Sequence, residues 1–282
     1  MSNLTSCLTS VRGKEVVTPL LAERLKQIDR RVRTGVKDKP FYVKKDARMT
    51  IDCFNMRIEE FNHGDEATKD YFHPSAIGQC LRKLWYKQLD APDNGPISPA
   101  ELLRQHLTFE IGTYFHVLFQ NLCQSAGILD EREVPIRNDE LRIIGHMDGR
   151  LHKIPGYGKV ALEIKTIKSA NWEKLVQPKQ EHSWQANIYG AVEKLDHLCF
   201  VYFNKDTSAT KEYFVKANPA EFENIVLPRI ASHHKAVAQC KAPNREGRSA
   251  SSFPCSYCEF SKVCWYGHED FMKTLKKKGG KK

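Results

Sequence analysis

Residues 145–166, GHMDGRLHKIPGYGKVALEIKT, contain the two strand-like segments that decide the fold. Apolar and β-branched residues alternate or run together on either side of the glycine-rich turn at 156–158, and this pattern predicts two strands joined as a hairpin. Side chains two positions apart on a strand point to the same face, so Glu163 and Lys165 project together. We expect the hairpin to bring Asp148, at the end of the first strand, towards them.

Two carboxylates that converge on one point repel each other unless a divalent cation neutralises them, so Asp148 and Glu163 indicate a site for Mg²⁺ or Mn²⁺. A lysine beside such an ion can orient a water molecule and stabilise charge on a phosphoryl group. The alternative is that Glu163 and Lys165 lie on a solvated face of the sheet, where this pattern is common.

Turn signals and hydrophobic periodicity predict the other elements. Helices are expected to begin at Thr18-Pro19 (running to Gly35), His73-Pro74, Ser98-Pro99 and Asn218-Pro219, with a kink near Pro228, and another is expected over about 182–196. Further strands are expected over 131–138, 197–206 and 210–218. The order predicts an α/β fold with a central mixed sheet flanked by helices.

Four regions follow from this pattern: a basic, partly helical N-terminal extension (1–73), the α/β core (74–254), a cysteine-rich segment (255–268) and a flexible basic tail (269–282). The chain of 282 residues carries 44 Lys and Arg against 34 Asp and Glu, a net charge of +10, which favours a polyanionic partner such as nucleic acid. Neither a signal peptide nor a membrane span is indicated, so we expect a cytoplasmic protein. The absence of a G-x-x-x-x-G-K-[ST] loop argues against a built-in helicase.

Three further side chains belong with the hairpin residues. His116 lies on the predicted helix after Ser98, and Gln185 and Tyr189 are four residues apart, so they share one helix face. The ordered set His116, Asp148, Glu163-x-Lys165 and Gln185-x-x-x-Tyr189, with Gly145 and Gly149 around the aspartate, resembles the PD-(D/E)xK nuclease superfamily and its RecB-like exonuclease branch.

The resemblance implies a restriction-endonuclease-like core and a metal-dependent deoxyribonuclease, acting as an exonuclease on single-stranded DNA in replication, recombination or repair, in a bacterial or phage setting. It implies that His116, Asp148, Glu163 and the main-chain carbonyl of Ile164 bind Mg²⁺ or Mn²⁺, and that Lys165 positions the attacking water. Gln185 and Tyr189 would contact DNA and support the lysine. A helicase, a recombinase or a single-strand-binding protein is the expected protein partner.

The cysteine-rich segment presents Cys255, Cys258 and Cys264 in a C-x₂-C-x₅-C pattern, which indicates a metal centre with one position left open. His268 would complete a zinc knuckle, and Cys80 is the other candidate. A zinc-knuckle protein with an inactive or partner-dependent nuclease fold is therefore the alternative function.

The sequence around Cys80 resembles the helix that supplies the first cysteine in iron–sulfur members of the same branch, such as CRISPR-associated prespacer-processing nucleases and AddB nuclease domains. That resemblance, which covers residues 74–266, implies a [4Fe–4S] cluster held by Cys80, Cys255, Cys258 and Cys264. Arg82 and Lys83 on this helix are expected to contact DNA.

Overall fold

The computed structural model describes residues 69–95 and 98–279, all within the second of two units, Glu59–Lys282. The predicted helix over 18–35 and the rest of the N-terminal extension up to residue 68 lie outside the described residues. None of the described helices is long and apolar enough to cross a membrane.

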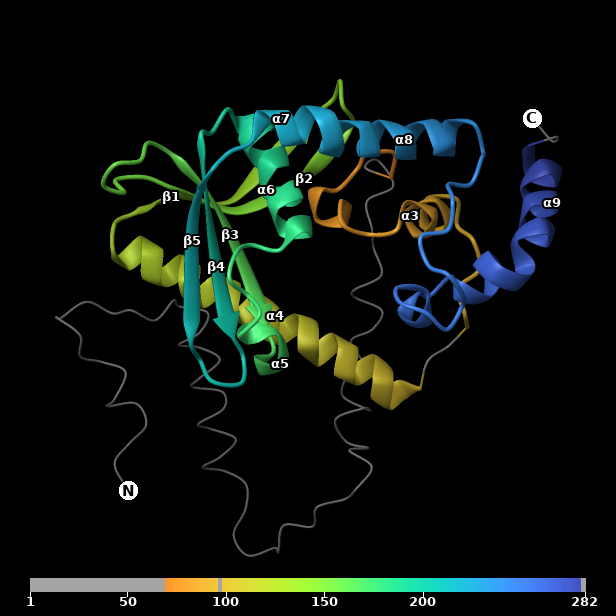
Figure 1. Ribbon diagram of the computed structural model, residues 1–282, viewed down its shortest axis with the longest axis horizontal. Helices are drawn as coiled ribbons and strands as arrows, with labels where there is room; N and C mark the ends of the chain where they lie inside the picture. Colours follow the sequence, from red (N-terminus) through yellow and green to blue (C-terminus); the bar gives the residue numbers. More distant parts are fainter. Residues whose placement is uncertain (1–68, 96–97, 280–282) are drawn as a thin grey trace, which may run out of the picture. The chain divides into compact units, whose positions relative to one another are not determined.

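A five-stranded mixed sheet forms the centre of the fold (Figure 1). Its strands lie in chain order: β1 (Leu129–Asn138), β2 (Ile143–Leu151), β3 (Val160–Ile167), β4 (His197–Asn204) and β5 (Thr210–Lys216). The β1–β2, β2–β3 and β4–β5 pairs are antiparallel, and β3 and β4 are parallel. A parallel pair needs a crossover connection, and the helix between β3 and β4 supplies it. The predicted α/β architecture, a mixed sheet flanked by helices, is confirmed.

Two of the helices, those that follow Ser98 and Asn218, begin at the capping residues that predict them. The longer helices are α3 (Leu81–Gln88), α4 (Pro99–Ser125), α6 (Gln180–Glu193), α8 (Leu227–Ala238) and α9 (His268–Gly279); α5 (Ser169–Trp172), α7 (Pro219–Glu221), η4 (Pro74–Ala76), η5 (Phe222–Val226), η6 (Cys255–Tyr257) and η7 (Val263–Gly267) are single turns. Ser98 Oγ accepts a hydrogen bond from the Glu101 N–H at 3.2 Å, and Asn218 caps α7 in the same way. The kink expected near Pro228 is the π-helical turn η5, directly before α8.

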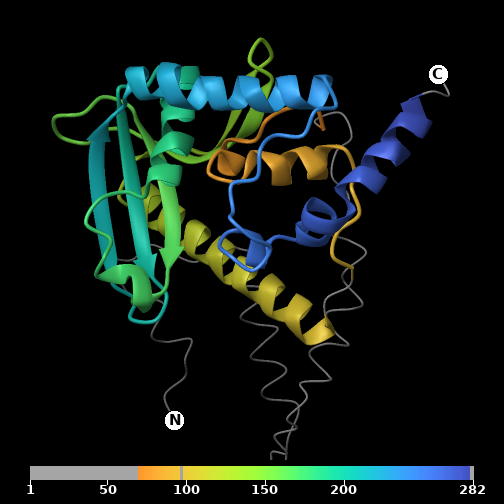
Figure 2. The same cartoon turned by 45° about the vertical axis from the view of Figure 1, so that its right-hand side comes forward.

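The two faces of the sheet are covered by different helices (Figure 2). On β4, Leu198, Phe200 and Tyr202 belong to the core cluster that includes the buried residues of α6. Cys199 and Val201, which alternate with them, pack in a separate cluster with Phe119 of α4. The strand period of two therefore assigns α6 and α4 to opposite faces, and side chains from both helices reach the sheet.

The helix predicted from His73-Pro74 is divided in two. The turn η4 ends at Ala76, and α3 begins only after Cys80, whose backbone is extended. Gly78 lies between them, and a Cβ there would be 2.4 Å from Cβ of Glu181 on α6. The chain must pass this close to α6, so a continuous helix does not form, and Cys80 becomes the residue that caps α3.

The C-terminal region also differs from the prediction, because residues 268–279 form helix α9 where a flexible tail was expected from residue 269. Phe271 is buried against Trp85 and Tyr86 of α3, and Met272 and Leu275 pack on the same cluster. The lysine-rich composition obscured these apolar residues, whose burial stabilises the helix.

Candidate active site and cysteine cavity

Asp148 lies beside the Glu-Ile-Lys segment because the β2–β3 ladder opens at this point. The last pair on this side joins Gly149 to Leu162. One residue further, Asp148 Oδ2 accepts a hydrogen bond from the backbone N–H of Ile164 at 2.5 Å. The carboxylate thus takes the place of a strand partner and is fixed at the middle of the segment from Glu163 to Lys165.

Glu163 is the most unusual acid of this region. Its side chain is 1 % exposed, and Lys165 Nζ forms an ion pair with one of its oxygens. Apart from that contact, neither oxygen has a hydrogen-bond partner in the part of the chain that the structure describes. Burial raises the pKa of Glu163 to about 7; the Lys165 charge opposes this rise and the Asp148 charge adds to it. This environment excludes the solvated-face alternative, and a further positive charge would stabilise the ionised form.

The face of α4 that meets Asp148 carries His116 and Gln120. His116 Nδ1 lies 3.2 Å from Asp148 Oδ1. Burial alone would lower the pKa of His116, but the hydrogen bond and charge of Asp148 outweigh it and the pKa is raised overall. Gln120 is buried and donates to the main-chain carbonyl of Asp148 at 2.7 Å and to Glu133 Oε1 at 2.5 Å. Gln120 was not predicted from the sequence, although it lies four residues after His116 and therefore on the same face of the helix.

Gln185 and Tyr189 form a buried layer behind the carboxylates. Gln185 Nε2 donates to Tyr189 Oη at 2.6 Å, and Tyr189 Oη donates to the carbonyl of His146 at 3.2 Å. Burial, reinforced by the Glu163 charge, raises the pKa of Tyr189 well above its usual value. Because Tyr189 is only 1 % exposed, these contacts fit a supporting role and do not fit the expected direct contact with DNA.

His182 and Tyr202 complete the surroundings of the lysine. Tyr202 is the β4 residue paired with Lys165 in the parallel register, and its Oη lies 2.8 Å from His182 Nδ1. Burial lowers the pKa of His182 to about 3, and the charges of Lys165 and Lys179 lower it further, so the imidazole is neutral. Neither residue was predicted, because the register of a parallel strand pair cannot be read from the sequence.

The chemistry of these side chains fits a hard divalent cation. Among the described residues, no three His, Cys, Asp or Glu side chains are already grouped as metal ligands. Asp148 contacts His116, and Glu163 contacts Lys165. Carboxylate oxygens are nevertheless the ligands that Mg²⁺ and Mn²⁺ prefer, and the buried oxygens of Glu163 have no other donor in the described ranges.

The four cysteines predicted to form a cluster line one cavity of about 620 Å³. Cys80 comes from the start of α3, and Cys255, Cys258 and Cys264 come from the C-terminal segment, so residues more than 170 positions apart meet there. All four are free thiols. Gly247 packs against the cavity, since a Cβ at this position would lie 2.4 Å from Cys255 Sγ.

The polar neighbours of the cavity have defined partners. His268 Nδ1 lies 2.8 Å from Tyr86 Oη, and His268 is not among the residues that line the cavity. Arg82, only 8 % exposed, donates to the carbonyl of Pro243 at 2.7 Å, and Lys83 pairs with Glu259 at 3.0 Å. A guanidinium held in this way is not free to contact a phosphate, which argues against the DNA contact predicted for Arg82.

The fold of this protein is similar to that of a solved structure. No model of a known protein family matches the sequence, and no curated protein resembles it in sequence. The structure described as SSO0001 is similar with a TM-score of 0.50 and 18 % identity, over 79 % of this chain and 98 % of that one. An alkaline exonuclease (LHK-Exo) from Laribacter hongkongensis gives a TM-score of 0.44 and 15 % identity, over 62 % of this chain and 93 % of that one, and its complex with dAMP gives 0.43 and 17 % over the same shares. The likeness to SSO0001 shows a common fold.

Proposed function

We propose that this protein is a Mg²⁺- or Mn²⁺-dependent nuclease that hydrolyses phosphodiester bonds of DNA, acting as an exonuclease on single strands. The observation that carries the proposal is the buried Glu163 carboxylate, placed beside Asp148 and held in an ion pair by Lys165. When both acids are ionised they carry two negative charges, and the ammonium group of Lys165 balances one of them. The other negative charge supports a cation site.

Each residue has a role in this proposal. Asp148, Glu163, His116 and the carbonyl of Ile164 would hold the ion, which when bound stabilises the charge on the phosphate and on the leaving oxygen. Lys165 orients the attacking water, because its ammonium group lies against Glu163 at the same face of β3. Gln120 fixes the main chain of Asp148, and Tyr189 and Gln185 form the rigid wall behind it.

The experiment measures cleavage of end-labelled single-stranded DNA by the full chain in EDTA, in Mg²⁺ and in Mn²⁺. We expect cleavage only with a divalent ion, and no cleavage by D148A, E163A or K165A, while binding of DNA is largely retained. E212A, which removes an exposed carboxylate from β5 of the same sheet, is the matched control. A circular single strand separates exonuclease from endonuclease action. Full activity in any of the three site variants would falsify the assignment.

We further propose that the cysteine cavity holds a [4Fe–4S] cluster bound by Cys80, Cys255, Cys258 and Cys264, with Zn²⁺ as the alternative. Four thiols on one cavity support four-cysteine ligation, and Arg82 and Arg245 on its wall would offset the negative charge of the thiolates. Anaerobic absorption spectra with iron and zinc analysis test it. A visible band lost in C80A and kept in H268A supports the cluster, and zinc lost only in H268A contradicts it.

A second candidate is a nucleic-acid-binding or assembly protein whose nuclease fold is inactive or depends on a partner such as a helicase, a recombinase or a single-strand-binding protein. The three cysteines of the C-terminal segment, whose spacing also suits a zinc knuckle, are the observation behind it. Cleavage by the isolated chain would reject this candidate. Cleavage that begins only on addition of a co-purifying protein would support it.

A further inference from the structure

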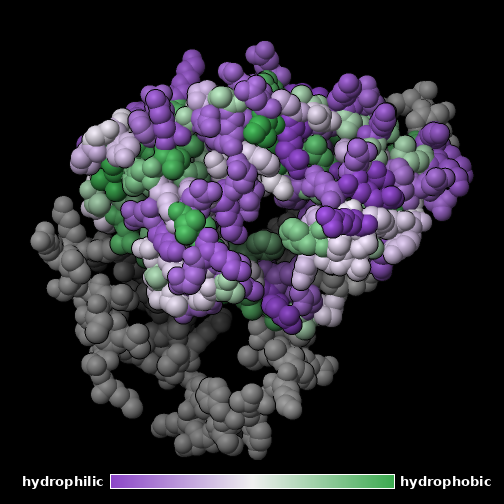
Figure 3. Space-filling model, viewed as in Figure 1, coloured by the Kyte–Doolittle hydropathy of each residue, from purple (hydrophilic) through white to green (hydrophobic). Residues whose placement is uncertain are grey.

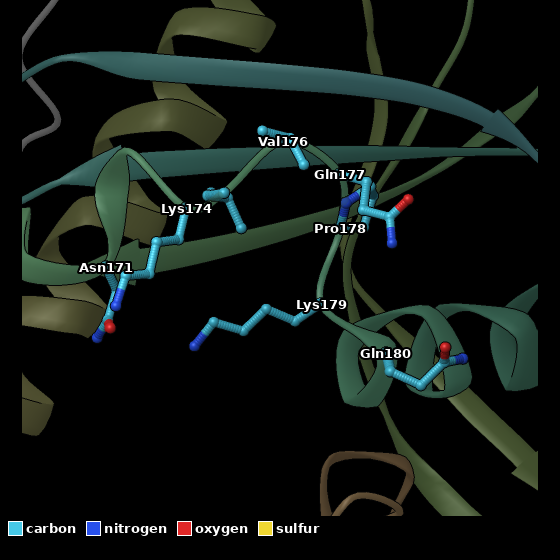
Figure 4. Close-up of a pocket in the computed structure, with 8 residues that line it drawn as sticks. Asn171, Lys174, Val176, Gln177, Pro178, Lys179 and Gln180 are labelled. Carbon is cyan, nitrogen blue, oxygen red and sulfur yellow. The ribbon is translucent and has the colours of Figure 1, made fainter.

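A second pocket lies on the connection between α5 and α6. It has a volume of about 340 Å³ and combines polar lining residues (Asn171, Lys174, Gln177, Lys179 and Gln180) with apolar ones (Leu175, Val176 and Pro178). In Figure 4 the side chains of Asn171, Lys174 and Lys179 extend towards the same open side of the pocket. In the broader view of Figure 3, hydrophilic side chains cover most of the visible face.

The charge of the pocket is positive and unneutralised. Two of its lining residues are lysines and none is an acid. Within the described ranges neither Lys174 nor Lys179 takes part in an ion pair, whereas Lys165 and Lys83 do. Two ammonium groups in a pocket whose lining includes no carboxylate favour a bound anion.

The pocket is held in shape by side chains from the sheet. Lys211 Nζ donates to the carbonyls of Trp172 at 2.7 Å and Leu175 at 3.1 Å, and Tyr213 Oη donates to Leu175 O at 2.6 Å. At the other end the N–H of Lys179 donates to Tyr202 Oη at 3.1 Å. Both ends of the segment are thus fixed to β4 and β5, so little ordering would be required when a ligand binds.

The same contacts connect the pocket to the proposed active site. Tyr202, which anchors Lys179, is the register partner of Lys165 and contacts His182. His182 is close enough to both Lys165 and Lys179 for each charge to lower its pKa, after the larger effect of burial. Tyr202 and His182 are therefore neighbours shared by the pocket and the proposed active site.

Two features at the rim indicate the class of anion. Lys179 is the N-cap of α6 and has no side-chain hydrogen bond to the helix, so the first turn is left without the usual oxygen acceptor. Val176, at 78 % exposure, gives the rim an apolar side chain. The free N–H groups of the first turn suit a phosphate of any kind, and the apolar side chain of Val176 favours a phosphate that carries a sugar and a base over inorganic phosphate.

We propose that this pocket binds a phosphate of the DNA strand that the active site engages, through Lys174, Lys179 and Asn171. The inference rests on the proposed nuclease function and adds a subsite to it. A terminal phosphate and an internal phosphodiester share this chemistry, so the experiment distinguishes the two sources.

The experiment measures DNA binding by the full chain in EDTA, so that no cleavage intervenes, using fluorescence anisotropy over a series of salt concentrations. The variants are K174Q, K179Q and the double variant, with K216Q, which removes an exposed lysine at the opposite end of β5, as the matched control. The probes are single-stranded oligonucleotides with a 5′-phosphate, a 3′-phosphate or hydroxyl ends, and a circular single strand.

We expect the double variant to bind about tenfold more weakly at low salt and to lose about 0.7 from the slope of log K against log salt for each phosphate contact removed, while K216Q is unchanged. A loss confined to one end-phosphorylated probe identifies a terminal phosphate. An equal loss on the circle identifies internal phosphates. Unchanged binding of every probe, or an equal loss in K216Q, overturns the inference. Cleavage is measured separately, so a protein that binds through the pocket but never cleaves contradicts only the nuclease proposal.

Discussion

The proposed active site and the cysteine cavity are assembled in opposite ways. In the first, Asp148, Glu163 and Lys165 come from one hairpin and are positioned by its ladder, with a single backbone hydrogen bond at Ile164 fixing the aspartate. In the second, Cys80 meets three cysteines from the far end of the chain, across a loop that contains the entire sheet. The contrast indicates that the first site depends on local geometry, and that the second depends on how the chain closes on itself.

The largest effect is expected on the cleavage rate, from a substitution in the proposed active site. E163Q keeps the size of the side chain but removes its charge, and because that charge is the one that would bind the proposed cation, we expect the cleavage rate to fall by about 10³-fold or more. The fold should be retained, since an amide is less costly to bury than a carboxylate. Single-turnover cleavage and thermal unfolding measure the two effects. Lost activity together with a lower melting temperature would show that Glu163 is structural.

A change in the cysteine cavity is expected to lower the stability of the fold. C80A is expected to lose bound iron and about 3 kcal/mol of unfolding free energy, because a ligand set that closes a long loop restricts the unfolded chain. C240A, which removes an exposed cysteine outside the cavity, is the control. Urea unfolding with metal analysis checks this. Equal stability of C80A and the unaltered protein would mean that the cavity does not fasten the C-terminal segment.

A smaller effect measures how much helix α4 adds to the site that the hairpin forms. Gln120 reaches it from α4, and Q120A removes the donor to the carbonyl of Asp148. We expect activity to fall by about 10- to 100-fold and the Mn²⁺ concentration for half-maximal activity to rise, as when a ligand loses its supporting hydrogen bond. Q105A removes an exposed glutamine from the same helix and should be neutral. Wild-type metal dependence in Q120A would mean that α4 adds nothing to the site.

The smallest effect concerns a histidine that belongs to neither site. His233 is 5 % exposed, packs against Phe72, and faces His234 and Arg142. Burial lowers its pKa from 6.5 to about 4, with smaller contributions from those two charges. The unfolded chain therefore binds the extra proton first, so this contribution to stability is present above pH 6.5 and is lost as the pH falls towards 4.

We expect the protein to lose about 1 to 2 kcal/mol more stability than H233F between pH 8 and pH 5. Denaturant unfolding at both pH values measures the difference. Comparing pH slopes, and not absolute stabilities, removes any packing change caused by the phenylalanine. Identical slopes would place the acid sensitivity of the fold elsewhere.

Sequence analysis was most successful where contacts are local. The five strands follow from alternation and turn signals, and the approach of Asp148 to Glu163 follows from one hairpin. The predictions from the sequence were wrong where contacts between distant residues decide which segment is helical. The break before α3 depends on Glu181, and the burial of Phe271 in α9 depends on Trp85.

The supporting residues of the candidate site show the same division. Gln185 and Tyr189 were found by their spacing. Their burial depends on how α6 packs on the sheet, so the sequence did not reveal that these two side chains are too buried for the predicted contact with DNA. His182 and Tyr202 became visible only when the register of β3 and β4 was known.

The hydrogen bond between the Ile164 N–H and Asp148 makes a carboxylate part of the backbone pairing of the sheet. Closing the hairpin and assembling the carboxylates are therefore one folding event. If β2 and β3 were paired while Asp148 lay away from Glu163, the backbone N–H of Ile164 would have no hydrogen-bond acceptor in the protein interior. In the proposed nuclease, regulation would accordingly act on access of the polymer or on supply of the ion, since Asp148 is positioned as soon as the sheet is paired.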